Sequence, residues 1–260
     1  MSHDVFFCVV ATLIAVGIAY AWSYSKLQGV GRDVKIASLT AVAQAIGVNY
    51  SIDVGQPPAF DRFRALKLLP SYDRSKFEDL FHGEYQGASF DLYEGLLENE
   101  TKDSKGNSSY TTVFRGQIIR LAFPRKFLGV TIVRRDQGFL NMFGEDKKNN
   151  WKRVGLEDPK FEKVFEVYGT DQVEARYLVH PVLMERLMAL ETGMKGEKLR
   201  CGFEEGDMLI AIEDGDRYEI GDLFKPLADP ERARKIVGDL SKVMQVMDSV
   251  LTAQAKRRGA

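Results

Sequence analysis

Residues Ser89–Glu98 read SFDLYEGLLE, and Phe90 and Leu92 alternate there with more polar neighbours. Alternation with a period of two places successive side chains on opposite faces of a β-strand. Two further strands are predicted over Tyr110–Phe123 and Leu128–Arg135. The natural arrangement of three such strands is an antiparallel meander. The predicted fold class is therefore α+β, with a mainly antiparallel sheet and packed helices.

Outside these strands, apolar residues recur at helical spacing, and end signals mark several helices. Ser75 and Glu78 have the spacing of a capping box, which predicts a short helix through His82. Asp171 is predicted to cap a helix that runs to about Val179. The expected elements are helices over residues 34–46, 60–69, 75–82, 171–179, 182–191 and 229–255, a strand over 161–168, a hairpin of 199–203 and 208–212, and loops over 51–58, 101–109 and 139–151.

The last predicted helix carries a wide apolar stripe. Its central positions are Ile236, Leu240, Val243, Met247 and Val250. A stripe of this width needs cover, whereas a coiled-coil seam is narrower and usually lasts longer. We therefore expect this helix to pack mainly on the body of the protein.

The N-terminal segment Val5–Trp22, VFFCVVATLIAVGIAYAW, contains no charged residue over 18 positions. As a helix it would be about 27 Å long, close to the ~30 Å of a bilayer core. The alternatives are a cleaved signal peptide and a buried soluble helix. Residues 1–4 contain no Lys or Arg, which argues against a signal peptide. We predict an uncleaved single-pass membrane anchor.

Charges beside this segment predict its orientation. Asp4 precedes it, whereas Lys26, Arg32 and Lys35 follow it. The positive-inside rule then places the C-terminal body in the cytoplasm. The predicted organisation is an anchor over residues 1–25, a juxtamembrane helix and linker over 26–59, a soluble α+β domain over 60–255 and a basic tail over 256–260.

The composition narrows the function classes. Lys and Arg number 36 against 37 Asp and Glu, so a global basic field for nucleic acid is excluded, although a local patch is not. Cys8 lies inside the predicted anchor and Cys201 in the body, so the two are not expected to pair. The three histidines are dispersed without metal-ligand spacing, and we expect no metal site and no cofactor.

Several stretches together resemble an uncharacterised bacterial membrane family, domain of unknown function 3137. They are LLPSYDRSKFEDLFHGEYQG (Leu68–Gly87), VFRGQIIRLAFP (Val113–Pro124), FEVYGTDQVEARYLVHPVLMERL (Phe165–Leu187) and LRCGFEEGDMLIAIEDGDRYEIGDLFKPL (Leu199–Leu227). The resemblance implies a short membrane segment, a cytosolic-type body and hence the bacterial inner membrane. It implies no activity, cofactor or catalytic residue. Members are sometimes encoded near LemA-like membrane proteins, which suggests a LemA-like partner.

Titratable residues offer few candidates for chemistry. Glu78 and His82 would share one face of the predicted helix and could work as an acid–base pair, or be a solvated histidine at a helix end. His180 precedes a proline at a helix break, where capping or packing is expected. Cys201 is expected to be a buried, inert thiol. No hydrolase, P-loop or kinase signature is present.

Two groups of residues are candidates for binding. Asp171, Glu174 and Arg176 lie at a predicted helix start, where free amides could hold an anion unless Asp171 itself caps them. A second group is basic and dense on the predicted meander, and could face anionic lipid headgroups or be a solvated strand face. It consists of Arg115, Arg120, Arg125, Lys126, Arg134 and Arg135, with Lys26, Arg32 and Lys35 near the anchor.

Two function classes remain. The first is a membrane-tethered, non-catalytic binding or scaffold module that faces the cytoplasm. The second is a membrane-anchored, hydrolase-like enzyme that uses carboxylates near His82 or Asp171. The missing nucleophile and metal motifs favour the first. Its expected partners are the membrane and a membrane-associated protein, not nucleic acid, and its oligomeric state is left open.

Overall fold

The computed structural model describes residues 32–33, 35–135, 149–193, 198–213 and 230–256. The predicted anchor Val5–Trp22 and most of the predicted loop 139–151 lie outside these ranges. Among the described residues, no helix combines the length and the apolar character needed to cross a membrane. The described chain is a mixed fold with a large antiparallel sheet and several helices, as predicted.

One sheet contains nine strands of the described chain, all paired in antiparallel fashion. The strands are β1 Asn49–Asp53, β2 Arg74–Tyr85, β3 Ala88–Lys102, β4 Ser108–Ala122, β5 Thr131–Arg135, β6 Lys152–Val154, β7 Phe165–Gly169, β8 Arg200–Glu204 and β9 Asp207–Glu213. Their order across the sheet is β1-β2-β3-β4-β9-β8-β5-β7-β6. The β8–β9 hairpin is confirmed as predicted.

The predicted meander is only partly correct. β3 and β4 pair as expected, but β5 lies between β8 and β7, and β4 pairs with β9 instead. Residues 123–127 run past the β8–β9 turn. The Phe123 N–H donates to the Gly206 carbonyl oxygen at 2.8 Å, and the Phe127 N–H donates to the Glu205 carbonyl oxygen. The β8–β9 hairpin is therefore inserted between the two strands that sequence order suggested were neighbours.

The predicted helix over residues 75–82 is wrong, because β2 is a 12-residue strand paired with both β1 and β3. The predicted loop over 51–58 is likewise partly wrong, since β1 begins the sheet. Gln86 and Gly87 join β2 to β3 with φ of 51° and 77°. Positive φ at both positions of a two-residue connection is typical of a type I′ hairpin turn. Long-range pairing thus overrides a local helix-start signal.

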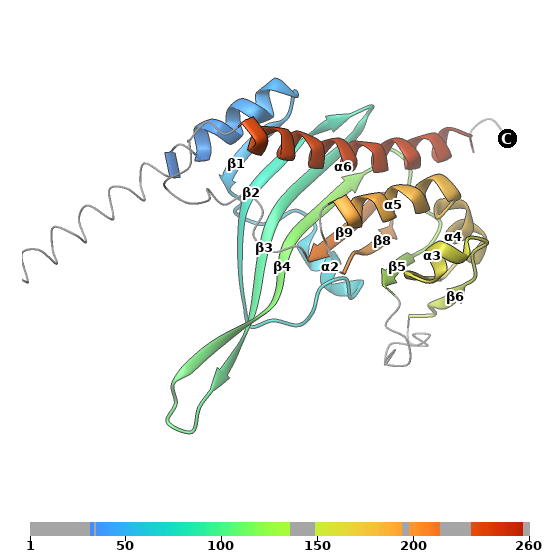
Figure 1. The fold of residues 1–260 in the computed structure, drawn as a ribbon. Helices are drawn as coiled ribbons and strands as arrows, with labels where there is room; N and C mark the ends of the chain where they lie inside the picture. The colour runs from blue at the N-terminus through green and yellow to red at the C-terminus, as the bar shows by residue number, and fades with distance from the viewer. Residues whose placement is uncertain (1–31, 34, 136–148, 194–197, 214–229, 257–260) are drawn as a thin grey trace, which may run out of the picture.

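The helices cover both faces of the sheet (Figure 1). They are α2 Phe60–Ala65, α3 Pro159–Glu162, α4 Gln172–Leu178, α5 Pro181–Gly193 and α6 Pro230–Lys256, with a further helix over residues 35–45. The helix of 35–45, α5 and α6 lie on one face, and α2 lies on the other. The strand predicted over 161–168 is in fact α3 followed by β7.

Each face of the sheet has its own hydrophobic core. Leu92 and Ile210 pack in the core beneath α5 and α6, whereas their chain neighbours Tyr93 and Leu209 pack in the core beneath α2. This alternation is the period of two that the sequence showed. The α6 stripe is buried as predicted, at 0–1% exposure: Ile236, Leu240, Val243, Met247 and Val250. α6 therefore packs on the body.

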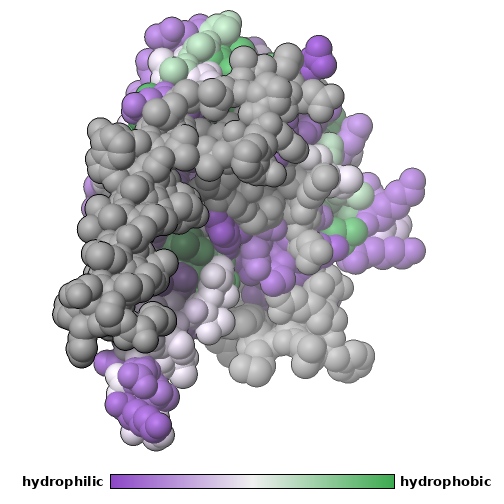
Figure 2. Space-filling model, turned by 60° about the vertical axis from the view of Figure 1, so that its left-hand side comes forward, coloured by the Kyte–Doolittle hydropathy of each residue, from purple (hydrophilic) through white to green (hydrophobic). Residues whose placement is uncertain are grey.

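Beyond the sheet, β3 and β4 continue as a two-stranded arm (Figure 1). The pairing of β2 with β3 stops at the base of the arm, where Arg74 lies opposite Glu98. The Arg74 guanidinium lies 3.2 Å from the centre of the Tyr110 ring and braces the base of the arm. The tip is a hydrophilic projection, as Figure 2 shows. The predicted loop over 101–109 is shorter, because Lys102 still pairs with Ser108.

A buried carboxylate joins the helix of residues 35–45 to the sheet. Asp79 is 0% exposed, with Lys35 Nζ 2.6 Å from its Oδ2, and the Tyr50 hydroxyl donates to its Oδ1 at 2.6 Å. Asp79 lies at an irregularity of β2, with φ of 60°. Lys35 is 6% exposed, so it fits neither alternative for the basic group, a lipid-facing surface or a solvated face. The helix of residues 35–45, β1 and β2 are thus joined at Asp79, through the ion pair with Lys35 and the hydrogen bond from Tyr50.

Burial of the α6 stripe gives a first prediction. Leu240→Ala should lower the free energy of unfolding by about 2–5 kcal/mol, because a buried leucine leaves a cavity. Val237, one turn away and 39% exposed, is the matched control, and Val237→Ala should cost under about 1 kcal/mol. Denaturant unfolding followed by circular dichroism measures both. Equal losses would show that α6 does not pack as described.

The Lys35–Asp79 pair gives a second prediction. Lys35→Met should destabilise the fold by about 3–5 kcal/mol, since it leaves Asp79 as an uncompensated buried charge. The double variant Lys35→Met/Asp79→Asn should lose much less, because asparagine tolerates positive φ and needs no counter-charge. Denaturant unfolding of both variants tests this coupling.

The same pair predicts a pH dependence. Burial raises the pKa of Asp79 above its ordinary value, despite hydrogen bonds from Lys35 and Tyr50. The folded state then holds the Asp79 proton more tightly than the unfolded state. The stability of Lys35→Met should therefore increase as pH falls from the raised pKa toward about 3.9. A defect that stays constant over this range would contradict this account.

Candidate functional site

A cavity of about 770 Å³ opens where α2 and the segment after it meet the ends of β5 and β8. In the part of the chain that the structure describes, six cationic side chains and one carboxylate line it. They are Arg64, Lys67, Arg134, Arg135, Lys198 and Arg200, with Asp61. This basic pocket brings together three parts of the chain that are far apart in sequence.

Close packing of α2 against β8 forms one wall of the basic pocket. A Cβ atom at Gly202 would lie 2.9 Å from Leu66 Cδ1 and 3.2 Å from Leu68 Cδ1, so a side chain at this position would force the two leucines to move. Arg62 of α2 also ties the helix to β8, because its Nε donates to Glu204 Oε2 at 3.0 Å. The exposed side of α2 then presents Arg64 to the pocket.

Two arginines face each other across the strands of the pocket floor. Arg134 on β5 is directly opposite Arg200 on β8. Like charges at such positions are destabilising. The Arg134 guanidinium stacks over the Tyr168 ring at 4.3 Å. Arg200 Nη1 donates to the Leu68 carbonyl oxygen at 3.2 Å. Both guanidinium groups are thus held in place by contacts with the body.

Carboxylates around the pocket offset part of this charge. Lys198 Nζ lies 3.2 Å from Glu213 Oε1, and Arg200 Nη2 lies 3.9 Å from Glu213 Oε2. Arg135 is 3.4 Å from Glu191, and Arg134 is 4.0 Å from a Glu166 oxygen. Burial lowers the pKa of Arg200, and the nearby Glu213 offsets this only in part.

The arrangement of these charges suits an anion. Among the described residues, the six lining cations outnumber the four nearby carboxylates of Asp61, Glu166, Glu191 and Glu213. Planar guanidinium groups bind carboxylate and phosphate oxygens with paired N–H donors. The pocket can therefore hold an anionic group against a preformed set of donors.

The predicted basic group divides between the pocket and other places. Arg134 and Arg135 line the pocket, whereas Arg115 is exposed on β4 opposite Leu96. Arg120 pairs with Asp91 at 3.1 Å and with Asp207 at 3.2 Å. Sequence reasoning missed the remaining cations, Arg64, Lys67, Lys198 and Arg200. Their positions gave no local signal, because they depend on how α2 and β8 pack.

The second predicted group is used in local structure. Asp171 Oδ1 accepts the N–H groups of Val173 and Glu174, both at 2.9 Å, so it caps α4. Glu174 is 3% exposed and accepts from the Gly129 N–H at 2.8 Å. Arg176 donates to the Gly155 carbonyl oxygen at 3.2 Å. The capping alternative therefore describes this helix start better than an anion site does.

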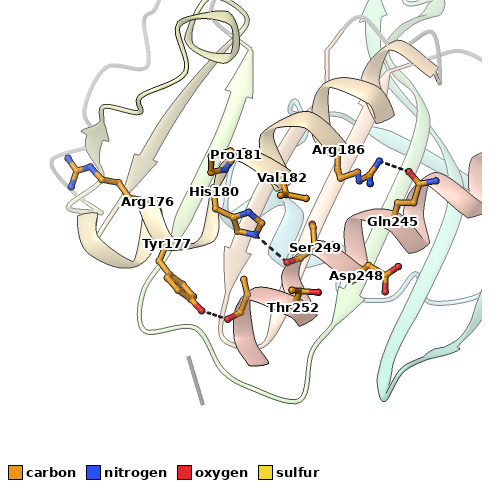
Figure 3. A pocket seen from close by; sticks show the side chains of 11 residues that line it. Arg176, Tyr177, His180, Pro181, Val182, Arg186, Gln245, Asp248, Ser249 and Thr252 are labelled. Carbon is orange, nitrogen blue, oxygen red and sulfur yellow. Dashed lines mark hydrogen bonds between the residues drawn. The ribbon is translucent and has the colours of Figure 1, made fainter. Parts of the chain in front are cut away.

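A second cavity, of about 580 Å³, lies between α6 and the junction of α4 with α5 (Figure 3). His180 Nδ1 accepts from the Leu183 N–H at 3.4 Å, so the proton is on Nε2, which faces the Ser249 carbonyl oxygen at 3.2 Å. Arg186 donates to Gln245 at 3.0 Å. The His180 ring thus bonds to backbone groups of α5 and α6, which matches the capping and packing role expected for it.

Glu78 and His82 lie on opposite faces of the sheet. Glu78 is paired with Glu94 and His82 with Asp91. Residues directly paired across two strands have their side chains on the same face of the sheet. Glu94 and Asp91 are three residues apart on β3, so their side chains lie on opposite faces, and the same holds for their partners Glu78 and His82. The irregularity at Asp79 causes this reversal. The structure does not bring the predicted acid–base pair together.

Cys201 lies in the core beneath α5 and α6, with 0% exposure. Burial raises the pKa of its thiol far above the ordinary value. Within the described ranges, no three His, Cys, Asp or Glu side chains gather closely enough to hold a metal ion.

The comparisons with known proteins give a family match and a weak similarity to a solved structure. Residues 112–251, more than half of the chain, match the family described as "Protein of unknown function (DUF3137)". The crystal structure of the mycobacterial trehalose monomycolate transport factor A, TtfA, is similar with a TM-score of 0.45 and 14% identity, over 84% of this chain and 95% of that one. No curated protein matches the sequence.

Burial of Cys201 predicts an unreactive thiol. In a full-length Cys8→Ser chain, labelling by an aromatic disulfide reagent should be at least about tenfold slower than for an exposed thiol, because the thiolate is scarce and inaccessible. Labelling should become fast in guanidinium chloride, which serves as the internal control. Rapid labelling of the folded chain would place Cys201 in an accessible site.

Proposed function

The chain belongs to the DUF3137 family, and we propose that it is a membrane-tethered, non-catalytic binding module. Its body faces the cytoplasm, and the basic pocket binds an anionic group of a ligand or partner. The observation that carries this proposal is the excess of cations in the pocket, with Arg134 directly opposite Arg200. Such an arrangement is unfavourable for the protein alone and favourable once an anion is bound.

The tether and the orientation rest on the sequence. The uncharged segment Val5–Trp22 is long enough to span a bilayer, and Lys26 and Arg32 follow it. A bacterial inner-membrane location agrees with the apolar segment and with the positive charges that follow it. A LemA-like protein is a candidate for a membrane-associated partner of the module.

Binding is favoured over catalysis by the positions of the candidate catalytic residues. Glu78 and His82 lie on opposite faces of the sheet, so they cannot share one substrate. Asp171 caps α4, and both ring nitrogens of His180 have partners in the body. The hydrolase-like alternative would need these groups to be available to a ligand.

Charge reversal tests the pocket as the anion-binding surface. The double variant Arg64→Glu/Lys67→Glu should weaken binding of hexaglutamate and of sulfate to the full-length chain in detergent by at least about tenfold. Both residues are exposed, so the fold should survive. Microscale thermophoresis gives the dissociation constants, and circular dichroism checks the fold.

The matched control makes the same charge change on the arm. Lys102 and Lys105 are exposed near the arm tip, remote from the pocket. Lys102→Glu/Lys105→Glu should leave anion binding within about twofold, since screening limits distant charges. Equal losses in both variants would mean that only net charge matters, and no loss in either would remove the pocket from the proposal.

A further inference from the structure

The anionic group that fits the basic pocket can be narrowed by its geometry. We propose that Arg134 and Arg200 bind a phosphate group, presented by a phosphate ester, with the other pocket cations around it. This inference rests on the proposed function, because it names the ligand chemistry of the same pocket.

The opposed arginines provide the first step. Arg134 and Arg200 are direct partners in the β5–β8 ladder, and antiparallel partners have Cβ atoms about 4.5–5.5 Å apart. Two guanidinium groups extending from such positions can converge on one small anion. A carboxylate has two oxygens and fills one guanidinium fork, whereas a phosphate has enough oxygens to engage both.

Preorganisation is the second step. Stacking on Tyr168 at 4.3 Å orients the Arg134 plane. The Leu68 carbonyl oxygen, 3.2 Å from Arg200 Nη1, fixes the Arg200 side chain, which is only 20% exposed. A ligand therefore meets donors that are already ordered, and ordering these side chains costs little on binding.

Charge is the third step. A phosphate monoester carries about −1.5 to −2 charges near neutral pH. Arg64, Lys67 and Lys198 surround the arginine pair and add positive charge, and the Ser71 residue of the lining supplies a hydroxyl group. A doubly charged group gains more from this set than a singly charged carboxylate does, because its attraction to each cation is doubled.

Size is the fourth step. The cavity of about 770 Å³ falls in the range of pockets that enclose small molecules, roughly 300–1,000 Å³. A phosphate ester could come from a soluble metabolite or from the headgroup of a phospholipid. The shared chemistry is the terminal phosphate, and the experiment separates the two sources.

The experiment uses the full-length chain in phosphatidylcholine nanodiscs and isothermal titration. The probes are glycerol 3-phosphate, short-chain phosphatidic acid, sulfate and acetate at constant ionic strength. Both phosphate probes should bind at least tenfold more tightly than acetate, which has two oxygens and one charge, whereas sulfate is the doubly charged reference oxyanion. Arg134→Gln and Arg200→Gln should each weaken phosphate binding at least tenfold. Circular dichroism confirms that each variant is folded.

The matched control is Arg153→Gln. Arg153 lies 3.9 Å from Glu166, the carboxylate that also faces Arg134, but it does not line the pocket. Arg153→Gln should leave the dissociation constant for each phosphate probe within twofold of that of the unmodified chain. Tighter binding of phosphatidic acid than of glycerol 3-phosphate, by tenfold or more, assigns the site to a lipid headgroup, and comparable affinities assign it to a soluble ester.

The outcomes separate the two proposals. If sulfate or hexaglutamate binds in the pocket but phosphate probes bind no more tightly than acetate, the phosphate inference is overturned and the anion-binding module stands. Phosphate binding that Arg134→Gln and Arg200→Gln both leave unchanged also overturns it. If no anion binds at all, both proposals fall.

Discussion

The pairing of β4 with β9 holds the two halves of this protein together. On one side lie β1, β2 and β3, and on the other lie β8, β5, β7 and β6. The junction runs from Gly116 opposite Glu213 to Ala122 opposite Asp207. It is covered on both faces, since Ile119 packs in one core and Ile118 in the other. The basic pocket depends on this junction, because α2 belongs to the first half and reaches the floor strands of the second.

Local signals predicted the elements whose partners are near in sequence. The alternation in Ser89–Glu98, the Asp171 cap and the hairpin over residues 199–212 were all confirmed. The β2 strand was missed because Ser75 and Glu78 imitate a helix start, while its partner strands were not used as evidence. The Gln86–Gly87 turn was the signal that could have found it. The position of β5 had no local signal, since it depends on a hairpin some 70 residues later.

In the candidate site, too, some residues could be predicted from local sequence and others depend on long-range strand pairing. The density of basic residues pointed to Arg134 and Arg135, but Arg120 in the same group turned out to be tied to Asp91 and Asp207. The density of basic residues along a sequence does not indicate which of them form ion pairs within the sheet and which of them line a pocket. Arg200 meets Arg134 only because β8 is inserted beside β5. A pocket built by lateral strand order cannot be read from a sequence whose strand order is unknown.

Arg134 and Arg200 are like charges at directly paired positions near the ends of β5 and β8, and such pairs are unfavourable in a sheet. Such a conflict costs up to about 1 kcal/mol, little beside two buried cores, and proteins commonly keep these conflicts at functional sites. An anion between Arg134 and Arg200 would turn the repulsion into two attractions across the β5–β8 ladder. Since α2 closes the same pocket through its contacts with Gly202 and Glu204, the anion would also tighten the link between the two halves of the sheet. An anion bound in the pocket would then stabilise the same relative placement of the two halves that the β4–β9 pairing sets.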